Sequence, residues 1–206
     1  MGIKNELIDL WGRNEKIEDY TEKLQNTDIV ILSTAPSYNF WRDGTIDANL
    51  SINLTRKIKS INKNIKLILV GPHATAIAST FFTSAADFVI KGEPDIAASE
   101  LTIKLINKDD YKNLPYIQYK EDESWKDNLG YANVDDLSIL PPLNFKKLRD
   151  GKYTWPKPNG EHNIQKVAAY EASRGCVYNC IFCFRAGFRG KFRLKSIEQI
   201  NQEIKK

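Results

Sequence analysis

Cysteine, histidine and methionine are scarce in this chain, and that scarcity limits the sites it can hold. Three cysteines, two histidines and one methionine occur among 206 residues. All three cysteines lie between positions 176 and 183, and an odd set packed so tightly cannot form a disulfide framework. Thiols grouped in this way in a protein of a reducing compartment usually bind metal. We therefore expect a metal site at the cysteines and a cytoplasmic location.

Long hydrophobic runs are lacking too. The longest are short, such as residues 29–32 and 67–70, whereas a membrane-spanning helix needs about 20 apolar residues. The N-terminal sequence has acidic residues where a signal peptide has an apolar stretch. Basic and aromatic residues do not alternate in a stripe that would suit nucleic acid. We therefore expect neither a membrane nor a nucleic acid as partner.

Positive charge is concentrated around and after the cysteines. The whole chain has a net charge of +4, and residues 171–206 alone hold eight Lys or Arg against three Glu. A solvated helix and loop would account for this excess. A surface for an anionic cofactor or substrate would account for it as well, and the sequence leaves both interpretations open.

The first 110 residues alternate between strand and helix patterns. Short apolar runs predict buried strands, and apolar residues at helical spacing predict helices. The predicted strands span residues 6–10, 28–34, 65–70 and 87–91, and the predicted helices span residues 17–25, 47–61, 74–84 and 94–107. Pro94 suits the first turn of the last helix. Repeated strand–loop–helix units predict a parallel sheet.

This pattern weakens further along the chain. Residues 116–120 predict an edge strand, and residues 121–163 are rich in acids, aromatics and prolines, which is typical of a linker. Periodicity returns at residues 165–172, a predicted strand that leads into the cysteines. Ser196 is the candidate N-cap of a helix that contains Ile197, Ile200 and Ile204.

The cysteines follow the spacing C-x3-C-x2-C, at Cys176, Cys180 and Cys183. Thiolates hold iron–sulfur clusters, and a four-iron cluster normally takes four of them. Three thiolates would leave one iron without a protein ligand, and an open coordination position is what a catalytic metal site requires. Two alternatives stay open: a zinc site with His162 as fourth ligand, and three cysteines that bind nothing.

The segment 171–183, EASRGCVYNCIFC, resembles the signature of radical S-adenosylmethionine (radical SAM) enzymes. The resemblance implies that the three cysteines ligate a [4Fe-4S] cluster, whose fourth iron is chelated by the amino and carboxylate groups of S-adenosylmethionine. It implies that reduction of the cluster cleaves the sulfonium and yields a 5′-deoxyadenosyl radical. Phe182 matches the aromatic position that lies beside the adenine; the alternative is an ordinary core aromatic.

Small residues follow three of the predicted strands, at 33–38, 71–75 and 92–94. Open parallel sheets bind ligands at the carboxyl ends of their strands, and small residues let a bulky ligand approach the backbone. The chain has no G-x-G-x-x-G or Walker sequence, so a dinucleotide or a nucleoside triphosphate is disfavoured.

Residues 28–107 are similar to the cobalamin-binding domain that precedes many radical SAM domains, most clearly at VGPHAT and VIKGEPD. This resemblance implies cobalamin contacts from nine residues at the strand ends: Ser33, Thr34, Ala35, Tyr38, Gly71, Pro72, His73, Gly92 and Glu93. The D-x-H-x-x-G pattern that supplies the lower cobalt ligand is absent, so that ligand is undetermined. His73 as an exposed loop residue and a scaffold that binds nothing are the alternatives.

Together these observations predict an α/β fold, with a flavodoxin-like (Rossmann-like) parallel sheet followed by the first β/α unit of a radical SAM partial TIM barrel. The expected domains are 1–112 for cobalamin, 113–163 for the linker and 164–206 for the start of the radical SAM domain. A complete barrel takes about 250 residues. We therefore expect a barrel truncated at its C-terminus, a cobalamin domain short at its N-terminus, and little cleavage of S-adenosylmethionine by this chain alone.

The resemblance implies a cobalamin-dependent methyltransferase that acts on an unactivated carbon or phosphorus of a small-molecule substrate. A reductase, a flavodoxin or a ferredoxin would donate the electron. Two alternatives remain. One is a radical SAM cyclase or oxidative enzyme of the same two-domain family, and the other is a non-catalytic module that binds cobalamin or metal.

Overall fold

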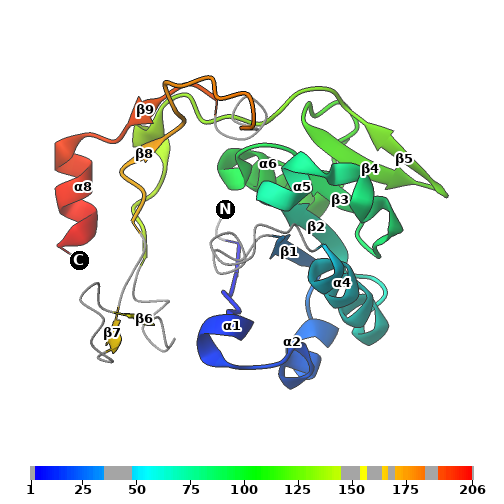
Figure 1. Cartoon of the computed structure of the whole chain (residues 1–206). Coiled ribbons are helices and arrows are strands. Elements are labelled where there is room, and N and C mark those ends of the chain that lie inside the picture. The colour runs from blue at the N-terminus through cyan, green and yellow to red at the C-terminus, as the bar shows by residue number, and fades with distance from the viewer. Residues whose placement is uncertain are drawn as a thin grey trace.

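Five strands form one mixed sheet in the computed structural model, which describes residues 3–34, 48–144, 154–156, 164–166, 170–183 and 190–205 (Figure 1). The strands are β1 (Ile29–Ser33), β2 (Lys66–Val70), β3 (Phe88–Ile90), β4 (Ile117–Glu121) and β5 (Ser124–Asp127), adjacent in that order. The pairs β1–β2 and β2–β3 are parallel. The pairs β3–β4 and β4–β5 are antiparallel. The fold is therefore α/β with a sheet compatible with a Rossmann-like domain.

The central strand β2 shows why this sheet needs cover on both faces. Leu67 and Leu69 pack in one hydrophobic cluster, while Ile68 and Val70 pack in the other. Side chains alternate between the two faces of a strand, so a strand that is apolar at every position must be buried on both. A continuous apolar run such as this one is typical of a central parallel strand.

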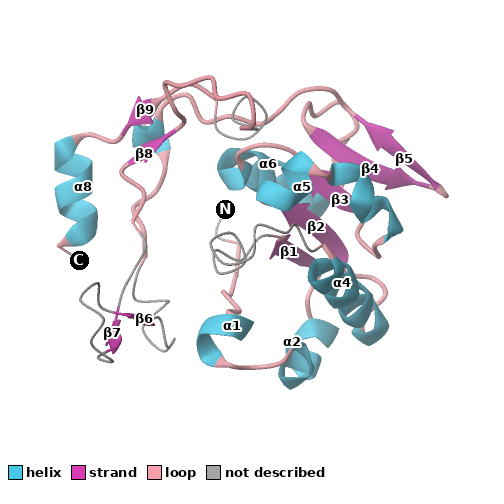
Figure 2. Cartoon of the chain, viewed as in Figure 1, coloured by secondary structure: helices cyan, strands magenta, loops and turns pink. Residues whose placement is uncertain are grey.

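Helices cover both faces (Figure 2). The Leu67 face packs against the 3-10 helix η1 (Ile17–Tyr20), α2 (Thr21–Gln25), α4 (Asn49–Ile61) and η2 (Ala78–Thr83). The Ile68 face packs against α6 (Pro94–Asn107). Two short helices, α1 (Leu10–Arg13) and α5 (Pro72–Ala76), complete this part. Pro94 occupies the first turn of α6, as predicted.

Between residues 17 and 107 the strands and helices follow the predicted order, with boundaries that differ by a few residues. The helix predicted at 74–84 is divided into α5 and η2, and the helix predicted at 17–25 begins as the 3-10 helix η1. The strand predicted at residues 6–10 is wrong, because residues 3–9 form no strand and α1 begins at Leu10. Glu6 instead forms an exposed ion pair with Lys23 of α2. Three apolar residues in this segment were too few to specify a strand without a partner strand.

The sheet continues beyond residue 112, into the segment predicted as a linker. The strand predicted at 116–120 exists as β4, but it is not an edge strand, because β5 pairs with its outer side. A tight turn with Asp122 at φ 52° joins the two strands. The ring of Trp125 in β5 stacks on Phe82 with centroids 4.9 Å apart. The division of the whole chain into domains stays a prediction.

The C-terminal elements are short and lie apart from the sheet in Figure 1. They are η3 (Leu137–Ile139), the antiparallel pair β6 (Thr154–Pro156) and β7 (Ile164–Lys166), the antiparallel pair β8 (Ser173–Arg174) and β9 (Arg193–Leu194), and α8 (Ile197–Ile204). The Ser196 Oγ accepts a hydrogen bond from the Gln199 N–H at 3.1 Å, which confirms the predicted N-cap.

The start of a radical SAM barrel is not confirmed. Of the strand predicted at 165–172, β7 contains residues 165 and 166, residues 167–169 lie outside the described residues, and residues 170–172 are not in a strand. β8 pairs antiparallel with β9, whereas the first two strands of such a barrel run parallel.

Among the helices in the described part of the chain, none is both long and apolar enough to cross a membrane.

Candidate functional site

The carboxyl ends of β1, β2 and β3 are joined by two buried threonines. The Thr34 Oγ1 donates to the Val70 carbonyl and accepts from the Ala74 N–H, both at 2.9 Å. The Thr75 Oγ1 donates to the Gly71 carbonyl and accepts from the Gly92 N–H, again at 2.9 Å. Each hydroxyl thus bonds to two backbone groups at or just after the strand ends, and one of these groups belongs to Ala74 in α5. At this edge of the sheet, each of the two threonine hydroxyls therefore donates its proton to a backbone carbonyl, so neither can donate a hydrogen bond to a ligand without breaking that bond.

The strand-end residues predicted to contact cobalamin differ in exposure. Ser33 is exposed and Pro72 is half-buried, so a ligand at this edge would meet these two first. Five others are buried: Thr34, Gly71, His73, Gly92 and Glu93. Ala35 and Tyr38 lie outside the described residues. The assignment of all nine to a cobalamin site stays a prediction.

His73 does not match the alternative of an exposed loop residue. It lies in α5 and is 7% exposed. Its carbonyl accepts a hydrogen bond from the Ile77 N–H at 2.9 Å, which caps the end of the helix. His73 is therefore a buried residue of the helix that follows β2.

The cysteine loop begins where β8 ends and carries all three cysteines of the chain. Cys176 is half-buried, whereas Cys180 and Cys183 are exposed. The Tyr178 N–H donates to the Cys176 Sγ at 3.4 Å, and the Cys183 N–H donates to the Cys180 carbonyl at 3.0 Å. The second bond closes a turn that contains two of the three cysteines.

The chemistry of these donors fits an iron–sulfur cluster. Three cysteines lie within eight residues of one loop, thiolates are the ligands of such clusters, and a backbone N–H already donates to one of the sulfurs. Within the described ranges, no three His, Cys, Asp or Glu side chains are gathered around a common metal position. His162, the fourth ligand of the zinc alternative, lies outside those ranges.

Phe182 is 88% exposed, so the alternative of an ordinary core aromatic is wrong for this structure. Its loop neighbours Val177, Tyr178 and Ile181 are exposed as well. The contact of Phe182 with adenine stays a prediction.

A cluster of charged side chains joins the cysteine loop to the end of β3. Glu93 is 4% exposed and accepts two hydrogen bonds from Arg193, at 2.7 and 3.0 Å, and one from the Val134 N–H at 2.9 Å. The Arg174 Nη1 lies 3.5 Å from the same carboxylate. Arg174 also donates two hydrogen bonds to Asp95, at 2.6 and 3.1 Å. We call Glu93, Asp95, Arg174 and Arg193 the Glu93 cluster.

The Glu93 cluster was not predicted from the sequence, in which Arg174 and Arg193 are two of the eight basic residues after position 170. In the structure their side chains are 15% and 9% exposed. Burial alone would lower the pKa of Arg174, but the hydrogen bond and charge of Asp95 and the charge of Glu93 outweigh it, so its pKa is raised. The positive charge near the cysteines is therefore partly neutralised within the protein.

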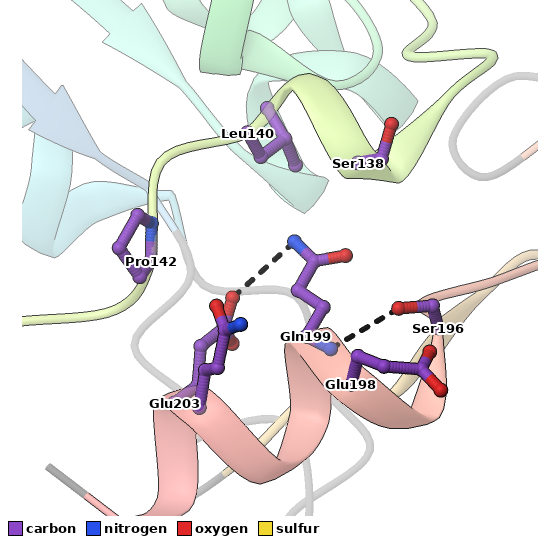
Figure 3. A pocket seen from close by; sticks show the side chains of 8 residues that line it. Ser138, Leu140, Pro142, Ser196, Glu198, Gln199 and Glu203 are labelled. Atoms are coloured by element: carbon purple, nitrogen blue, oxygen red, sulfur yellow. Dashed lines mark hydrogen bonds between the residues drawn. The ribbon is translucent and has the colours of Figure 1, made fainter.

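A second polar group fixes α8 to the segment after β5. The side chains of Lys195 and Glu203, which are 7% and 0% exposed, form an ion pair at 2.7 Å. The Gln199 Nε2 donates to Glu203 and to the Leu137 carbonyl, each at 3.3 Å. Figure 3 shows the pocket beside this group, between α8 and residues 138–142. Buried ion pairs need such additional hydrogen bonds to offset desolvation.

Comparison with curated proteins finds three distant relatives. They are an uncharacterised methyltransferase of Pyrococcus horikoshii (26% identity over 149 residues), an anaerobic magnesium-protoporphyrin IX monomethyl ester cyclase of Synechocystis (24% over 118 residues) and a 2-(S-pantetheinyl)-carbapenam-3-carboxylate methyltransferase of Streptantibioticus cattleyicolor (22% over 157 residues). All three are named as enzymes, two of them as methyltransferases.

The similarity covers most of this chain but little of the relatives. The alignments span 71%, 57% and 74% of the chain, respectively, but 31%, 22% and 23% of the three proteins. The chain thus matches less than a third of the length of each relative. No protein-family model matches the chain.

Proposed function

We propose that this chain belongs to a radical SAM enzyme in which Cys176, Cys180 and Cys183 hold a [4Fe-4S] cluster. The observation that carries this proposal is the single loop that holds three cysteines in the spacing C-x3-C-x2-C. Three thiolates satisfy three irons of a four-iron cluster and leave the fourth for another ligand. The distant similarity to two methyltransferases and a cyclase supports an enzyme with related chemistry.

When bound, the cluster would supply the electron that cleaves S-adenosylmethionine. The chain's own residues would position that chemistry. The three thiolates hold the cluster, and the turn closed between Cys180 and Cys183 fixes the separation of two of them. The N–H of Tyr178 stabilises charge on the Cys176 sulfur. The exposed ring of Phe182 offers a flat apolar surface for the adenine.

The proposed reaction is methyl transfer that depends on cobalamin, acting on an unactivated carbon or phosphorus of a small molecule. The order of the domains, with an α/β sheet before the cysteine loop, supports this choice. A ring-forming or oxidative reaction is the second candidate, favoured by the similarity to the magnesium-protoporphyrin ester cyclase. A non-catalytic binding module would share the cofactors but not the turnover.

Binding of S-adenosylmethionine to the open iron tests the proposal directly. Protein reconstituted anaerobically with iron and sulfide and then reduced should give the EPR signal of a [4Fe-4S] cluster, and S-adenosylmethionine should change that signal. The reason is that its amino and carboxylate groups would occupy the fourth iron. The spectrum reports binding without requiring turnover. Adenosine, which lacks both groups, should leave it unchanged. Stoichiometric zinc retained through reconstitution would contradict the proposal.

Cobalamin binding is tested separately. Hydroxocobalamin should bind the full chain with about one equivalent, measured by equilibrium dialysis and the visible spectrum. His73→Gln should leave the visible spectrum of the bound cobalamin unchanged, and likewise its EPR spectrum after reduction to cob(II)alamin, because His73 is buried in α5 and the D-x-H-x-x-G pattern is absent. A changed cobalt spectrum in this variant would show that His73 is a ligand. Absence of binding to the wild type would favour a scaffold without cobalamin.

A further inference from the structure

Arg174 and Arg193 face each other across the β8–β9 pair. They are direct partners in its antiparallel register, and both side chains are largely buried. Like charges directly opposite one another destabilise a strand pair. The pairing of β8 with β9 therefore needs a negative group between the two guanidinium groups.

Glu93 is that negative group. Its carboxylate accepts two hydrogen bonds from Arg193 and lies 3.5 Å from Arg174. A bidentate pair between Arg and a carboxylate is strong and directional. Asp95, in the first turn of α6, holds the other side of the Arg174 guanidinium by two hydrogen bonds. Removing either carboxylate would leave a buried guanidinium group with fewer partners, which is costly.

The position of Arg174 constrains the position of Cys176, because the two residues are close in the backbone. Arg174 is separated from Cys176 by Gly175 alone. Gly175 has φ +83°, and a Cβ there would lie 2.1 Å from the Lys191 carbonyl oxygen of the segment leading to β9. The chain is therefore tightly confined between the anchored arginine and the cysteine.

We infer that Glu93 and Asp95 are positioning residues for the cysteine loop: they fix Arg174 and thereby set the place of Cys176 relative to the carboxyl end of β3. The effect on the metal centre rests on the proposed function, whereas the effect on the thiol does not. Glu93 then serves the cysteine loop through its buried ion pairs, whether or not a ligand binds at the sheet edge.

The first test measures the thiol in cluster-free protein. Iodoacetamide should alkylate half-buried Cys176 more slowly than exposed Cys180, as resolved by mass spectrometry. Glu93→Gln and Asp95→Asn should each accelerate alkylation of Cys176 by about tenfold, the scale expected from loss of one charge-assisted hydrogen bond. Alkylation of Cys180 should change little, because its exposure does not depend on the Glu93 cluster. Asp95→Glu, which keeps the carboxylate, should restore a slow rate at Cys176.

The matched control is Glu100→Gln, a carboxylate on the same helix that accepts from the Tyr116 hydroxyl at 2.8 Å instead; it should leave the Cys176 rate unchanged. If Glu93→Gln does not fold, as judged by circular dichroism, Asp95→Asn at an exposed position still decides the question. Unchanged alkylation of Cys176 in Asp95→Asn would overturn the inference.

The second test uses reconstituted protein. Asp95→Asn should bind as much iron as the wild type but show a different EPR line shape and a weaker response to S-adenosylmethionine, and Asp95→Glu should recover both. A spectrum identical to that of the wild type would overturn the role at the metal centre. If the wild type itself binds no cluster, the proposed function fails, and the alkylation rates still decide the positioning role.

Discussion

Replacing any one of Cys176, Cys180 and Cys183 by alanine is expected to abolish cluster formation. The wild type should hold about four irons per chain after anaerobic reconstitution, as three thiolates and one open site allow. A variant with two thiolates leaves two irons without protein ligands, so the cluster should not survive removal of excess iron and sulfide. Iron and sulfide analysis after gel filtration measures this loss, together with the disappearance of the brown colour of the reconstituted protein.

The control for this loss is a substitution on the same loop that spares the thiols. Val177→Ala removes an exposed apolar side chain next to Cys176 and should retain the full iron content. Loss confined to one of the three cysteine variants would show that the other thiols are not ligands. Stoichiometric iron in all three variants would show that the cluster is not bound by this loop.

The sheet could be predicted where its signals are local. Residues 66–70 and 88–90 are apolar at nearly every position, and such runs predict buried strands without knowledge of their partners. The helices α4 and α6 follow from apolar spacing and from Pro94 in the same way. These features depend on residues a few positions apart, so the sequence alone displays them.

The strand β5 shows where local patterns fail. Of its four residues, Ser124, Lys126 and Asp127 are exposed, and Trp125 alone packs inward, against Phe82. A short edge strand with one half-buried side chain has almost no alternation to detect. Its place in the sheet depends on pairing with β4 and on a ring 43 residues earlier in the sequence, and neither contact is visible in a window of neighbouring residues.

The candidate site divides in the same way. The three candidate thiol donors are proposed from their spacing in the sequence, because the ligands of a loop-bound cluster must be close together, and their role as ligands stays a prediction. The Glu93 cluster joins residues up to 100 positions apart, and its charged members are individually typical of a surface. In the folded chain the side chains of Glu93, Arg174 and Arg193 are largely buried, and there they hold distant segments together through ion pairs. The sequence therefore offers candidate donors, whereas the charged contacts beside the cysteine loop can be read only from the folded chain.

Gly92 gives the largest stability effect that we expect outside the cysteine loop. It has φ +96°, and a Cβ there would lie 2.2 Å from the Ala132 carbonyl oxygen. That oxygen accepts a hydrogen bond from the Glu93 N–H at 2.8 Å, and the Ala132 N–H donates one to the Lys91 carbonyl at 2.8 Å. Gly92→Ala must therefore strain the backbone of residue 92 and also displace the backbone of Ala132, which is hydrogen-bonded on both sides of it. We expect a loss of about 3–5 kcal/mol in the free energy of unfolding, measured by urea denaturation.

Gly130→Ala separates the two contributions. Gly130 has a similar φ of +104°, but a Cβ there would meet nothing within 4 Å. This variant carries the backbone strain without the collision, so it should lose about 1–3 kcal/mol and less than Gly92→Ala under the same conditions. Equal losses in the two variants would mean that the contact with Ala132 relaxes at little cost. A larger loss at Gly130 would contradict the close approach of Gly92 to Ala132.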